Sequence, residues 1–469
     1  MEKIETNIKA EAQVNVWAEQ QCFEKQVQSL LEAGSPKAFV RTYGCQQNVS
    51  DSEKLSGMLE QMGYSFADRP EDADLIIFNT CAVREHAEQR VFGNVGALKK
   101  LKEANPKMII ALCGCMMQQK HIVQQIKKSY PYVDLVFGTG ALPRFPELLF
   151  RVLTEGKHLS DLSLAENMPE GMPVRRDSAY KAWLPVMHGC NNFCTYCIVP
   201  YVRGREHSRA PAYILHEAEE LIHAGTKEIT LLGQNVNSYG NDSESNWDFS
   251  RLLDAVCKIP GDFRVSFMTS HPKDASHRLL ETIAQNPKIS RRLHLPFQSG
   301  SDRILHKMNR KYTATDYRAL AAEAKRMIPG LCLTSDVIVG FPGETREDFE
   351  QTLSLVKDVG FANLYTFLYS PRKGTPAAKM VDPVSREEKG GWFAELLKIQ
   401  EENGRAFLES HIGKIEHVLA ESVQNGTAFG RTDSGIPVTF LADRPGAFYD
   451  IKIKTRKGVT LFGEQKGTN

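Results

Sequence analysis

The sequence contains no long hydrophobic run. No stretch of apolar residues approaches the roughly 20 that a membrane-spanning helix needs. The first residues, Met1-Glu-Lys-Ile-Glu-Thr6, also lack the basic and then apolar order of a secretory signal. We therefore expect a cytoplasmic protein that has no membrane partner.

The chain also has almost no net charge. The formal value of +1 excludes a strong overall field for a polyanion, so any nucleic-acid contact must come from a local basic patch. With 469 residues, 42% of them apolar, the chain is too long for one compact core and has an ordinary globular composition. Its ten cysteines, in a reducing compartment, are metal or redox ligands more often than disulfide partners.

Three of these cysteines lie in one short loop. Cys190, Cys194 and Cys197 are spaced C-x3-C-x2-C, directly after an apolar run. A cubane of four irons usually takes four thiolates, so this loop leaves one iron open for a substrate or cofactor. The alternative is a zinc site with His188 as fourth ligand. Zinc sites prefer two C-x2-C or C/H pairs, and the loop has only one, so the pattern favours the iron–sulfur cluster.

The region 37–155 alternates strand-like runs with helical periodicity. Runs at 38–43, 75–79, 108–112 and 135–137 predict strands, and 52–62 and 85–104 predict helices. This alternation predicts a doubly wound parallel sheet with its ligand crevice at the carboxyl ends of the strands.

Three further cysteines follow the first three predicted strands. Cys45, Cys81 and Cys115 would share one sheet edge and form a second three-thiolate site, or they are separate buried thiols, since their distant spacing carries no code. The polar residues nearby serve as partners of sulfur or simply as loop caps. These residues are Asn79, Thr80 and Gln118.

After a linker at 156–180, the region 181–402 repeats a strand–helix unit six times. The predicted strands are 184–188, 228–232, 264–268, 292–295, 332–339 and 363–369. Six units fall short of the eight of a closed barrel and predict an open partial (βα)6 barrel with its site at the carboxyl ends of the strands. His271 and His294 border that mouth, and we interpret them as hydrogen-bonded histidines rather than catalysts.

The two ends of the chain differ from this core. The extension 1–36 contains one amphipathic stretch, which predicts a helix at 14–31. The region 403–466 has the short runs of a small β-module, and its stretch 451–457 alternates apolar and cationic residues. These cations either protect an edge strand or contact phosphates from a barrel, and the pattern leaves both open. They are Lys452, Lys454, Arg456 and Lys457.

Six motifs are distributed over most of the chain, and one of them contains the cysteine loop. They are Tyr43-Gly-Cys-Gln-Gln-Asn48, Asn79-Thr-Cys-Ala-Val-Arg-Glu85, Gly114-Cys115, the stretch from Gly189 to Glu206, Gly233-Gln-Asn-Val-Asn-Ser-Tyr239 and His294-Leu-Pro-Phe-Gln-Ser-Gly-Ser-Asp302. Together they closely resemble the radical S-adenosylmethionine (SAM) methylthiotransferases. The resemblance covers the chain from Lys37 to about Gly463 and excludes the N-terminal extension.

The resemblance implies an α/β multidomain enzyme with a doubly wound N-terminal domain, a partial (βα)6 radical-SAM barrel and a C-terminal TRAM β-barrel. It implies two 4Fe-4S clusters, an auxiliary one on Cys45, Cys81 and Cys115 and one on the loop cysteines that binds SAM. One SAM would methylate a sulfur, and a second would be cleaved to a 5′-deoxyadenosyl radical. Strand-end position makes Tyr196, Gln234, Gln298 and Ile338 the candidates for contacting SAM.

The residues after Cys45 separate the branches of this family. Cys45-Gln-Gln-Asn48 is similar to the branch that modifies isopentenyladenosine in tRNA, which usually has Met at the place of Gln47. The implied substrate is carbon 2 of that base at position 37, in a tRNA anticodon stem-loop whose phosphates Arg203, Arg205 and the cations of 451–457 would contact. The alternative is an aspartate of a ribosomal protein. We also expect that a flavodoxin- or ferredoxin-type protein donates the electrons and that the enzyme is a monomer.

Overall fold

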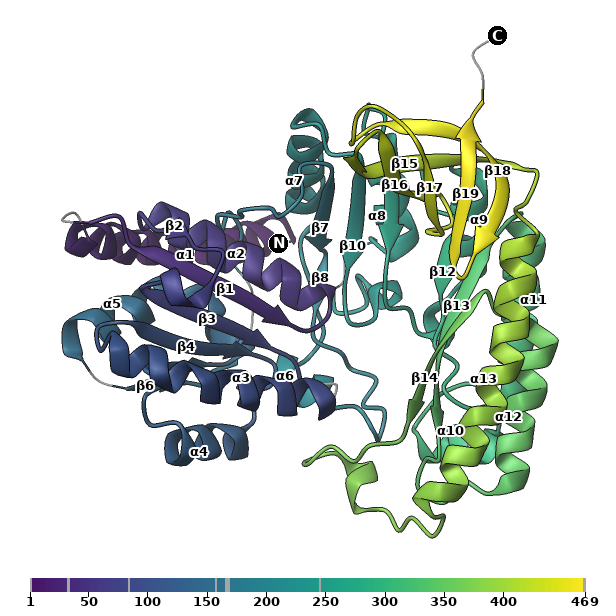
Figure 1. Cartoon of the computed structure of the whole chain (residues 1–469), viewed down its shortest axis with the longest axis horizontal. Coiled ribbons are helices and arrows are strands. Elements are labelled where there is room, and N and C mark those ends of the chain that lie inside the picture. The colour runs from purple at the N-terminus through teal and green to yellow at the C-terminus, as the bar shows by residue number, and fades with distance from the viewer. Residues whose placement is uncertain are drawn as a thin grey trace. The chain divides into compact units, whose positions relative to one another are not determined.

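The computed structural model shown in Figure 1 describes residues 2–31, 34–82, 85–156, 158–164, 169–243 and 246–466. The chain forms two compact units, and it passes between them several times. The first unit contains Met1–Asp177, His188–Asn191 and Ile198–His207, and the second contains Ser178–Met187, Asn192–Cys197 and Ser208–Asn469. Among the helices in the described ranges, none is both long and apolar enough to cross a bilayer.

The first unit is built on a six-stranded parallel sheet with the strand order β2-β1-β3-β4-β5-β6. Its central strands β3 and β4 are buried along their whole length, as parallel strands covered on both faces must be. This confirms the predicted doubly wound sheet. The short strands β2 and β6 were not predicted, and β6 lies within the expected linker, of which residues 157 and 165–168 are outside the described ranges. The strands are β1 (Lys37–Tyr43), β2 (Ser65–Phe66), β3 (Leu75–Thr80), β4 (Ile109–Gly114), β5 (Leu135–Phe137) and β6 (Leu159–Asp161).

Two separate cores cover the two faces of this sheet. Alternate residues of β3 point to opposite faces, so that Ile77 belongs to one core and Ile76 to the other. The core around Ile77 packs against α1 (Glu2–Leu31), α2 (Gln46–Gln61) and α5 (Phe145–Glu155), and the core around Ile76 packs against α3 (Glu85–Ala104) and α4 (Lys120–Ser129). Trp17 and Val27 of α1 are buried in the first of these cores, so the helix expected at 14–31 is present and docked.

The second unit contains all six predicted strands of the partial barrel. They form two parallel sheets, β11-β10-β7 and β12-β13-β14. One parallel bridge, Val265 to Ile289, connects β11 to the segment before β12, after which the chain turns to pair with β13. The arrangement confirms an interrupted, open partial barrel. The strands are β7 (Lys181–Pro185), β10 (Glu228–Leu232), β11 (Arg264–Phe267), β12 (Arg292–His294), β13 (Cys332–Val339) and β14 (Asn363–Leu368).

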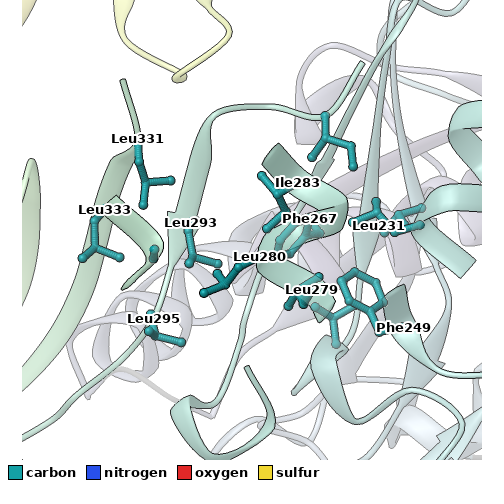
Figure 2. Close-up of a cluster of buried hydrophobic side chains, with 14 of the residues drawn as sticks. Leu231, Phe249, Phe267, Leu279, Leu280, Ile283, Leu293, Leu295, Leu331 and Leu333 are labelled. Atoms are coloured by element: carbon teal, nitrogen blue, oxygen red, sulfur yellow. The ribbon is translucent and has the colours of Figure 1, made fainter. Parts of the chain in front are cut away.

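Helices cover one face of these strands through a shared apolar core. Figure 2 shows Leu231 and Phe267 from the strands beside Leu280 and Ile283 of α9. Because alternate strand residues enter this core, the residues between them line the opposite, inner face of the partial barrel. The helices are α7 (Pro211–His223), α8 (Phe249–Lys258), α9 (His277–Gln285), α11 (Ala314–Met327), α12 (Arg346–Val359) and α13 (Arg386–Glu409). The short helix α10 (Asp302–Lys307) instead buries Ile304 in a separate apolar cluster.

The C-terminal β-module is a closed barrel of five strands in the order β15-β16-β17-β19-β18. Strand β18 pairs with both β15 and β19, so it is not an edge strand. Its lysines therefore do not serve as edge protection. Strand β19 was not predicted. The strands are β15 (Ile415–Gln424), β16 (Thr427–Thr432), β17 (Pro437–Leu441), β18 (Phe448–Lys457) and β19 (Thr460–Gln465).

The barrel is anchored to the rest of the second unit by the turn between β16 and β17. Asp433 accepts a hydrogen bond from Arg264 of β11 at 3.0 Å through its carboxylate, and from the N–H of Arg291 at 3.0 Å through its carbonyl. The preceding helix α13 buries Trp392 and Leu396 in the same core as the partial barrel. The expected domain limit at residue 402 therefore falls inside a helix that the core holds.

Candidate functional site

The structure gathers the three cysteines of the parallel sheet. Cys81 and Cys115 directly follow β3 and β4, and Cys45 follows β1 after Gly44. These three strands pair side by side with parallel register. Burial raises the pKa of the Cys115 thiol to about 12, and the guanidinium of Arg203 opposes that shift. The thiols of Cys81 and Cys45 raise the pKa of Cys115 further, which places them within electrostatic reach of it. We call these three residues the sheet trio.

The turn that presents Cys115 requires glycine. Gly114 has a φ of +93°, and a Cβ atom there would lie 2.5 Å from the carbonyl oxygen of Thr80 and overlap with the side chain of Asn79. Helix α2, which follows β1, is also hydrogen-bonded to the end of β3. Asn48 donates to Oδ1 of Asn79 at 3.0 Å, and Asn79 donates to the carbonyl of Asn48 at 2.8 Å. The sheet edge around the thiols is therefore a fixed structure.

The polar residues expected near these thiols make hydrogen bonds to neighbouring parts of the first unit. Thr80 donates from Oγ1 to the carbonyl of Cys113 at 2.5 Å, and Gln118 donates from Nε2 to the carbonyl of Leu162 at 2.6 Å. The amide nitrogen of Asn79 also donates to Oγ of Ser52 in α2 at 3.0 Å. The contacts of Asn79 and Thr80 connect the end of β3 to α2 and β4, and both interpretations from the sequence stay open.

Two sulfurs of the sheet trio have hydrogen-bond partners: Sγ of Cys45 donates to Oδ1 of Asn48 at 3.4 Å, and Arg203 contacts Cys115. Arg203 lies at the end of α6 (Val199–Arg203), and its Nε–H donates to Sγ of Cys115 at 3.1 Å. Its Nη2 donates to Oδ2 of Asp51 at 2.8 Å, and the arginine side chain is only 8% exposed. This placement does not fit the phosphate contact expected from the sequence, because the guanidinium is already paired and turned away from solvent. Nothing local in the sequence links Arg203 to Asp51.

The first part of the cysteine loop belongs to the first unit. The N–H of Cys190 donates to the carbonyl of Gly204 at 3.3 Å. Gly189 has a φ of +73°, and a Cβ atom there would overlap with the carbonyl oxygen of Arg205. His188 packs edge-on against His207, with ring centroids 5.6 Å apart, and burial lowers the pKa of His188 to about 4. The imidazole of His188 is therefore neutral at pH 7.

The second part of the loop belongs to the second unit. Cys194 and Cys197 are joined by a turn in which the N–H of Cys197 donates to the carbonyl of Cys194 at 2.9 Å. Asn309 donates from Nδ2 to the carbonyl of Phe193 at 3.0 Å, and the buried Arg310 donates from Nη1 to Sγ of Cys194 at 3.5 Å. Asn309 and Arg310 were missed from the sequence, because no spacing relates them to the loop. We call Cys190, Cys194 and Cys197 the loop trio.

The four SAM candidates all lie in the second unit. The N–H of Gln298 donates to the carbonyl of Asp336, and its carbonyl accepts from Ile338, so Gln298 is held beside β13 with a φ of +67°. Oε1 of Gln298 and Oε1 of Gln234 are buried without a hydrogen-bond partner in the described chain. Tyr196 and Ile338 pack against one apolar cluster. Buried acceptors beside an apolar wall fit a ligand with amino and hydroxyl groups.

Other buried polar atoms without a partner in the described chain follow the carboxyl ends of the barrel strands β10, β11, β13 and β14. Oε1 of Glu344 is one of them, although its Oε2 accepts from the N–H groups of Gly340 and Phe341. Burial raises the pKa of Glu344 to about 7. Thr269, after β11, has a φ of +70°, and strained backbone of this kind concentrates at functional sites. The further atoms are Asn235 Oδ1, Asn237 Oδ1 and Nδ2, Ser270 Oγ and Tyr369 OH.

The inner face of β12-β13-β14 presents two exposed aromatic rings. Tyr365 stands opposite Asp336, and Phe367 stands opposite Ile338, in the parallel register of β13 and β14. The two aromatic residues are 40% and 38% exposed. His294 contacts Oγ1 of Thr334 at 3.0 Å through Nδ1. That contact confirms the interpretation of His294 as a hydrogen-bonded histidine.

His271 is also hydrogen-bonded. It caps a short helical turn by accepting from the N–H of Lys273 at 3.2 Å. Burial lowers the pKa of His271 to about 2, with the cations of Arg310 and Lys273 adding to the shift. The ring is neutral at pH 7 and has a structural role in the described chain.

The cations of β18 lie on the outer face of the barrel. Ile451 and Ile453 point into the barrel core while Lys452 and Lys454 are exposed, which confirms the predicted alternation. Lys454 pairs with Glu464 at 2.5 Å and Arg456 with Glu409 at 2.7 Å. Lys457 is exposed beyond them, and Arg205 is exposed in the first unit. The line of positive charge is therefore partly neutralised within the protein.

Within the described ranges, no three His, Cys, Asp or Glu side chains stand around one point that would hold a single metal ion. A cluster of several irons takes its thiolates one per iron, so its ligands do not need to converge on one point. The sheet trio fits such a group, because its three thiols share one edge and a guanidinium faces one of them.

Comparison with family models and solved structures gives the class of the protein. The model described as "Radical SAM superfamily" matches residues 184–356, and the one described as "Uncharacterized protein family UPF0004" matches residues 37–138. A solved radical S-adenosylmethionine methyltransferase, TsrM from Kitasatospora setae, aligns over 73% of this chain and 74% of its own with a TM-score of 0.54. At 13% identity this likeness concerns the fold alone. The fold and the family model define a radical-SAM protein.

Curated relatives give the particular family. A tRNA-2-methylthio-N(6)-dimethylallyladenosine synthase of Alkaliphilus oremlandii is 50% identical over 434 residues, which cover 91% of this chain and 92% of that protein. The protein with the same name from Acetivibrio thermocellus is 48% identical over 458 residues and 95% of each chain. The chain belongs to the family of tRNA-2-methylthio-N(6)-dimethylallyladenosine synthases.

Proposed function

We propose that this enzyme uses SAM to attach a methylthio group to carbon 2 of N(6)-dimethylallyladenosine at position 37 of tRNA, next to the anticodon. The product is 2-methylthio-N(6)-dimethylallyladenosine. The observation that carries the proposal is the presence of two thiol trios in one chain, since the reaction needs both a radical source and a sulfur donor. The names of relatives that are about half identical over nearly the whole chain support the same substrate.

In this proposal residues 181–402 form the radical-SAM core, and the loop trio holds a 4Fe-4S cluster through three thiolates. SAM would occupy the open position of that cluster. When bound, the cluster and SAM supply a radical that removes a hydrogen atom from an unactivated carbon. The buried acceptors of Gln234 and Gln298 would bind the polar groups of SAM, while Tyr196 and Ile338 pack against its apolar parts and exclude water.

The sheet trio would hold a second 4Fe-4S cluster in residues 37–155. The parallel register fixes which strand end carries each thiol, and Gly114 lets the chain turn so that Cys115 faces the same edge. When bound, this cluster would hold the sulfur that receives the methyl group. Cys81 and Cys115 are buried, while Cys45 is exposed, so the trio has one side open to solvent.

The tRNA would be held by residues 403–466 as a TRAM barrel. Lys452, Lys454, Arg456 and Lys457 would contact phosphates of the anticodon stem, and Arg205 is a further candidate. A loop nucleotide is already unpaired and enters a pocket at a cost of a few kcal/mol or less. The exposed rings of Tyr365 and Phe367 on the inner barrel face are suited to stack on its base.

The direct test uses the anaerobically reconstituted, full-length protein. It is incubated with SAM, a reductant and one of three substrates. These are tRNA that carries N(6)-dimethylallyladenosine, the same tRNA without that modification, and the ribosomal protein whose aspartate would be modified in the alternative function. We expect mass spectrometry of the nucleosides to show the methylthio product only with the first substrate. A methylthio group on the protein instead of the RNA would favour the aspartate-modifying alternative and contradict the proposal.

The RNA surface is tested with point variants, because a cut within α13 would expose the core around Trp392. Lys452→Ala with Lys457→Ala should weaken tRNA binding and lower the slope of log affinity against log salt by about 1 per lost phosphate contact. Lys398→Ala, on the exposed side of α13, is the control. Equal affinity of the double variant and this control would remove β18 from the RNA surface.

A further inference from the structure

The first unit contains a buried ion pair beside a cysteine. Arg203 and Asp51 have side chains that are 8% and 5% exposed, and their Nη2 and Oδ2 atoms lie 2.8 Å apart. A buried ion pair adds little or no stability compared with apolar packing, because both charges lose their hydration. Its presence here is better explained by the third contact, the hydrogen bond from Nε of Arg203 to Sγ of Cys115.

The guanidinium is fixed from both sides. Asp51 uses its other oxygen, Oδ1, to accept from Nε2 of Gln47 at 3.2 Å, so both oxygens of the carboxylate are engaged. The backbone of α6 is also held, since Thr139 donates from Oγ1 to the carbonyl of Val202 at 2.6 Å. Val202 is buried against Cys115 itself. Arg203 therefore does not swing out to solvent without breaking this set of contacts.

We propose that Arg203 is a positioning residue of the second cluster, which orients the Cys115 ligand and raises the reduction potential of that cluster. The inference rests on the proposed function, because it requires that Cys115 binds iron. Hydrogen bonds to ligand sulfurs and a nearby positive charge stabilise the more negative, reduced state of an iron–sulfur cluster. Arginine suits the task because its rigid fork presents separate donors to the carboxylate and to the sulfur, which one lysine ammonium does not reproduce.

The experiment isolates the second cluster in the full-length protein. Cys194→Ala with Cys197→Ala removes two ligands of the first cluster and serves as the parent. Arg203→Gln, Arg203→Lys and Arg144→Gln are each made in that parent. Arg144 is the control, because it also pairs with carboxylates of the first unit, Glu147 and Asp161, although its side chain is more exposed than that of Arg203. Iron content, the electron paramagnetic resonance (EPR) spectrum and the midpoint potential are measured for each.

We expect Arg203→Gln to lower the midpoint potential and change the EPR spectrum of the reduced cluster. Arg203→Lys should give an intermediate potential because it keeps the charge but only one of the two contacts. Arg144→Gln should match the parent. A potential and spectrum equal to the parent in both Arg203 variants would overturn the inference. If Arg203→Gln does not bind iron, the lysine variant decides the question by the same measurement.

Two further outcomes distinguish a failure of this inference from a failure of the proposed function. A parent protein that holds no iron after reconstitution would contradict the second cluster of the proposed function itself. The affinity for tRNA is measured on the same variants. Weaker tRNA binding by Arg203→Gln with an unchanged potential would return Arg203 to the phosphate-binding role and overturn its role at the cluster.

Discussion

The two thiol trios are built in different ways. The loop trio lies within eight consecutive residues, so the covalent chain itself limits the distances between its thiols. The sheet trio comes from residues far apart in sequence, and only the pairing of β1, β3 and β4 places them at one edge. Both use the same local device, a glycine with positive φ directly before a cysteine, at Gly114 and at Gly189.

The difference shows how each trio depends on the fold. A slip of one residue in the pairing of β3 with β4 would turn every side chain of a strand to the other face and separate Cys81 from Cys115. The same slip would leave the spacing of the loop trio unchanged. We therefore expect the sheet trio to be sensitive to changes in packing and the loop trio to changes in its own residues.

The largest effect should come from the loop trio. Cys194→Ala removes one of only three thiolates, and we expect the formation of 5′-deoxyadenosine from SAM to fall to the level measured without enzyme. Chromatography of the products of an anaerobic reaction checks this. Cys257→Ala, at a buried cysteine of α8, is the control. Cleavage of SAM at the wild-type rate by the Cys194 variant would contradict the assignment of the loop trio.

Cys81→Ala should separate the two trios. We expect it to keep the cleavage of SAM but to form no methylthio product, because the loop trio is unchanged and the sheet trio loses a ligand. Both products are measured in the same reaction, and iron content should fall by the share of one cluster. Methylthio product from this variant would show that the sheet trio is not needed for sulfur transfer.

The two glycines provide a more local comparison. Gly114→Ala and Gly189→Ala each force a residue with a Cβ atom into positive φ, at a cost of about 1–3 kcal/mol before any overlap is counted. We expect Gly114→Ala to reduce the iron of the sheet trio and Gly189→Ala to reduce the cleavage of SAM. Iron content is measured for each variant in the Cys194→Ala, Cys197→Ala parent, which lacks two ligands of the loop trio. SAM cleavage is measured for each variant in the otherwise wild-type protein. Identical defects in both variants would contradict the separation of the two sites.

The smallest effect concerns the stability of the first unit. Glu24 of α1 is buried, its Oε1 has no partner in the described chain, and burial raises its pKa from the ordinary value of 4.5 to about 7. The folded state therefore holds this proton more tightly than the unfolded state does. As pH rises from about 4.5 through 7, the protein should lose stability, up to about 3 kcal/mol from this group.

Glu24→Gln removes that cost, so it should raise the free energy of unfolding at pH 8 and change it little below pH 4.5. Denaturant titration at both pH values measures the difference. Glu19→Gln, at an exposed position of the same helix, is the control. A gain that is equal at both pH values, or equal in the control, would show that ionisation of Glu24 does not destabilise the fold.

Most strands were predictable from the sequence because their residues carry the pattern locally. Strands β10 and β13 begin and end where the apolar runs do. Strands β2, β6 and β19 were missed, since they are short or contain few apolar residues and exist because a neighbouring strand offers hydrogen bonds. The N-cap of α12 at Thr345 is also a local feature, because its partner Asp348 is three residues away.

The contacts around the thiols follow the same rule. The loop trio was recognised from spacing alone. The sheet trio needed the predicted strand ends, and the resemblance to a known family was required to choose it over separate buried thiols. Arg310, which donates to Cys194, and Arg203, which donates to Cys115, were not found as partners of sulfur. A partner that is distant in sequence leaves no periodic or spaced signal.

The sequence by itself determined the order of the domains, the strand–helix repeats and the residues that carry thiols, because these depend on neighbours along the chain. Tertiary structure alone decided that β18 is enclosed in a closed barrel and that Arg203 faces a sulfur instead of solvent. The physical reason is that burial and hydrogen bonding between distant segments depend on strand register and packing, which no local pattern of residues records.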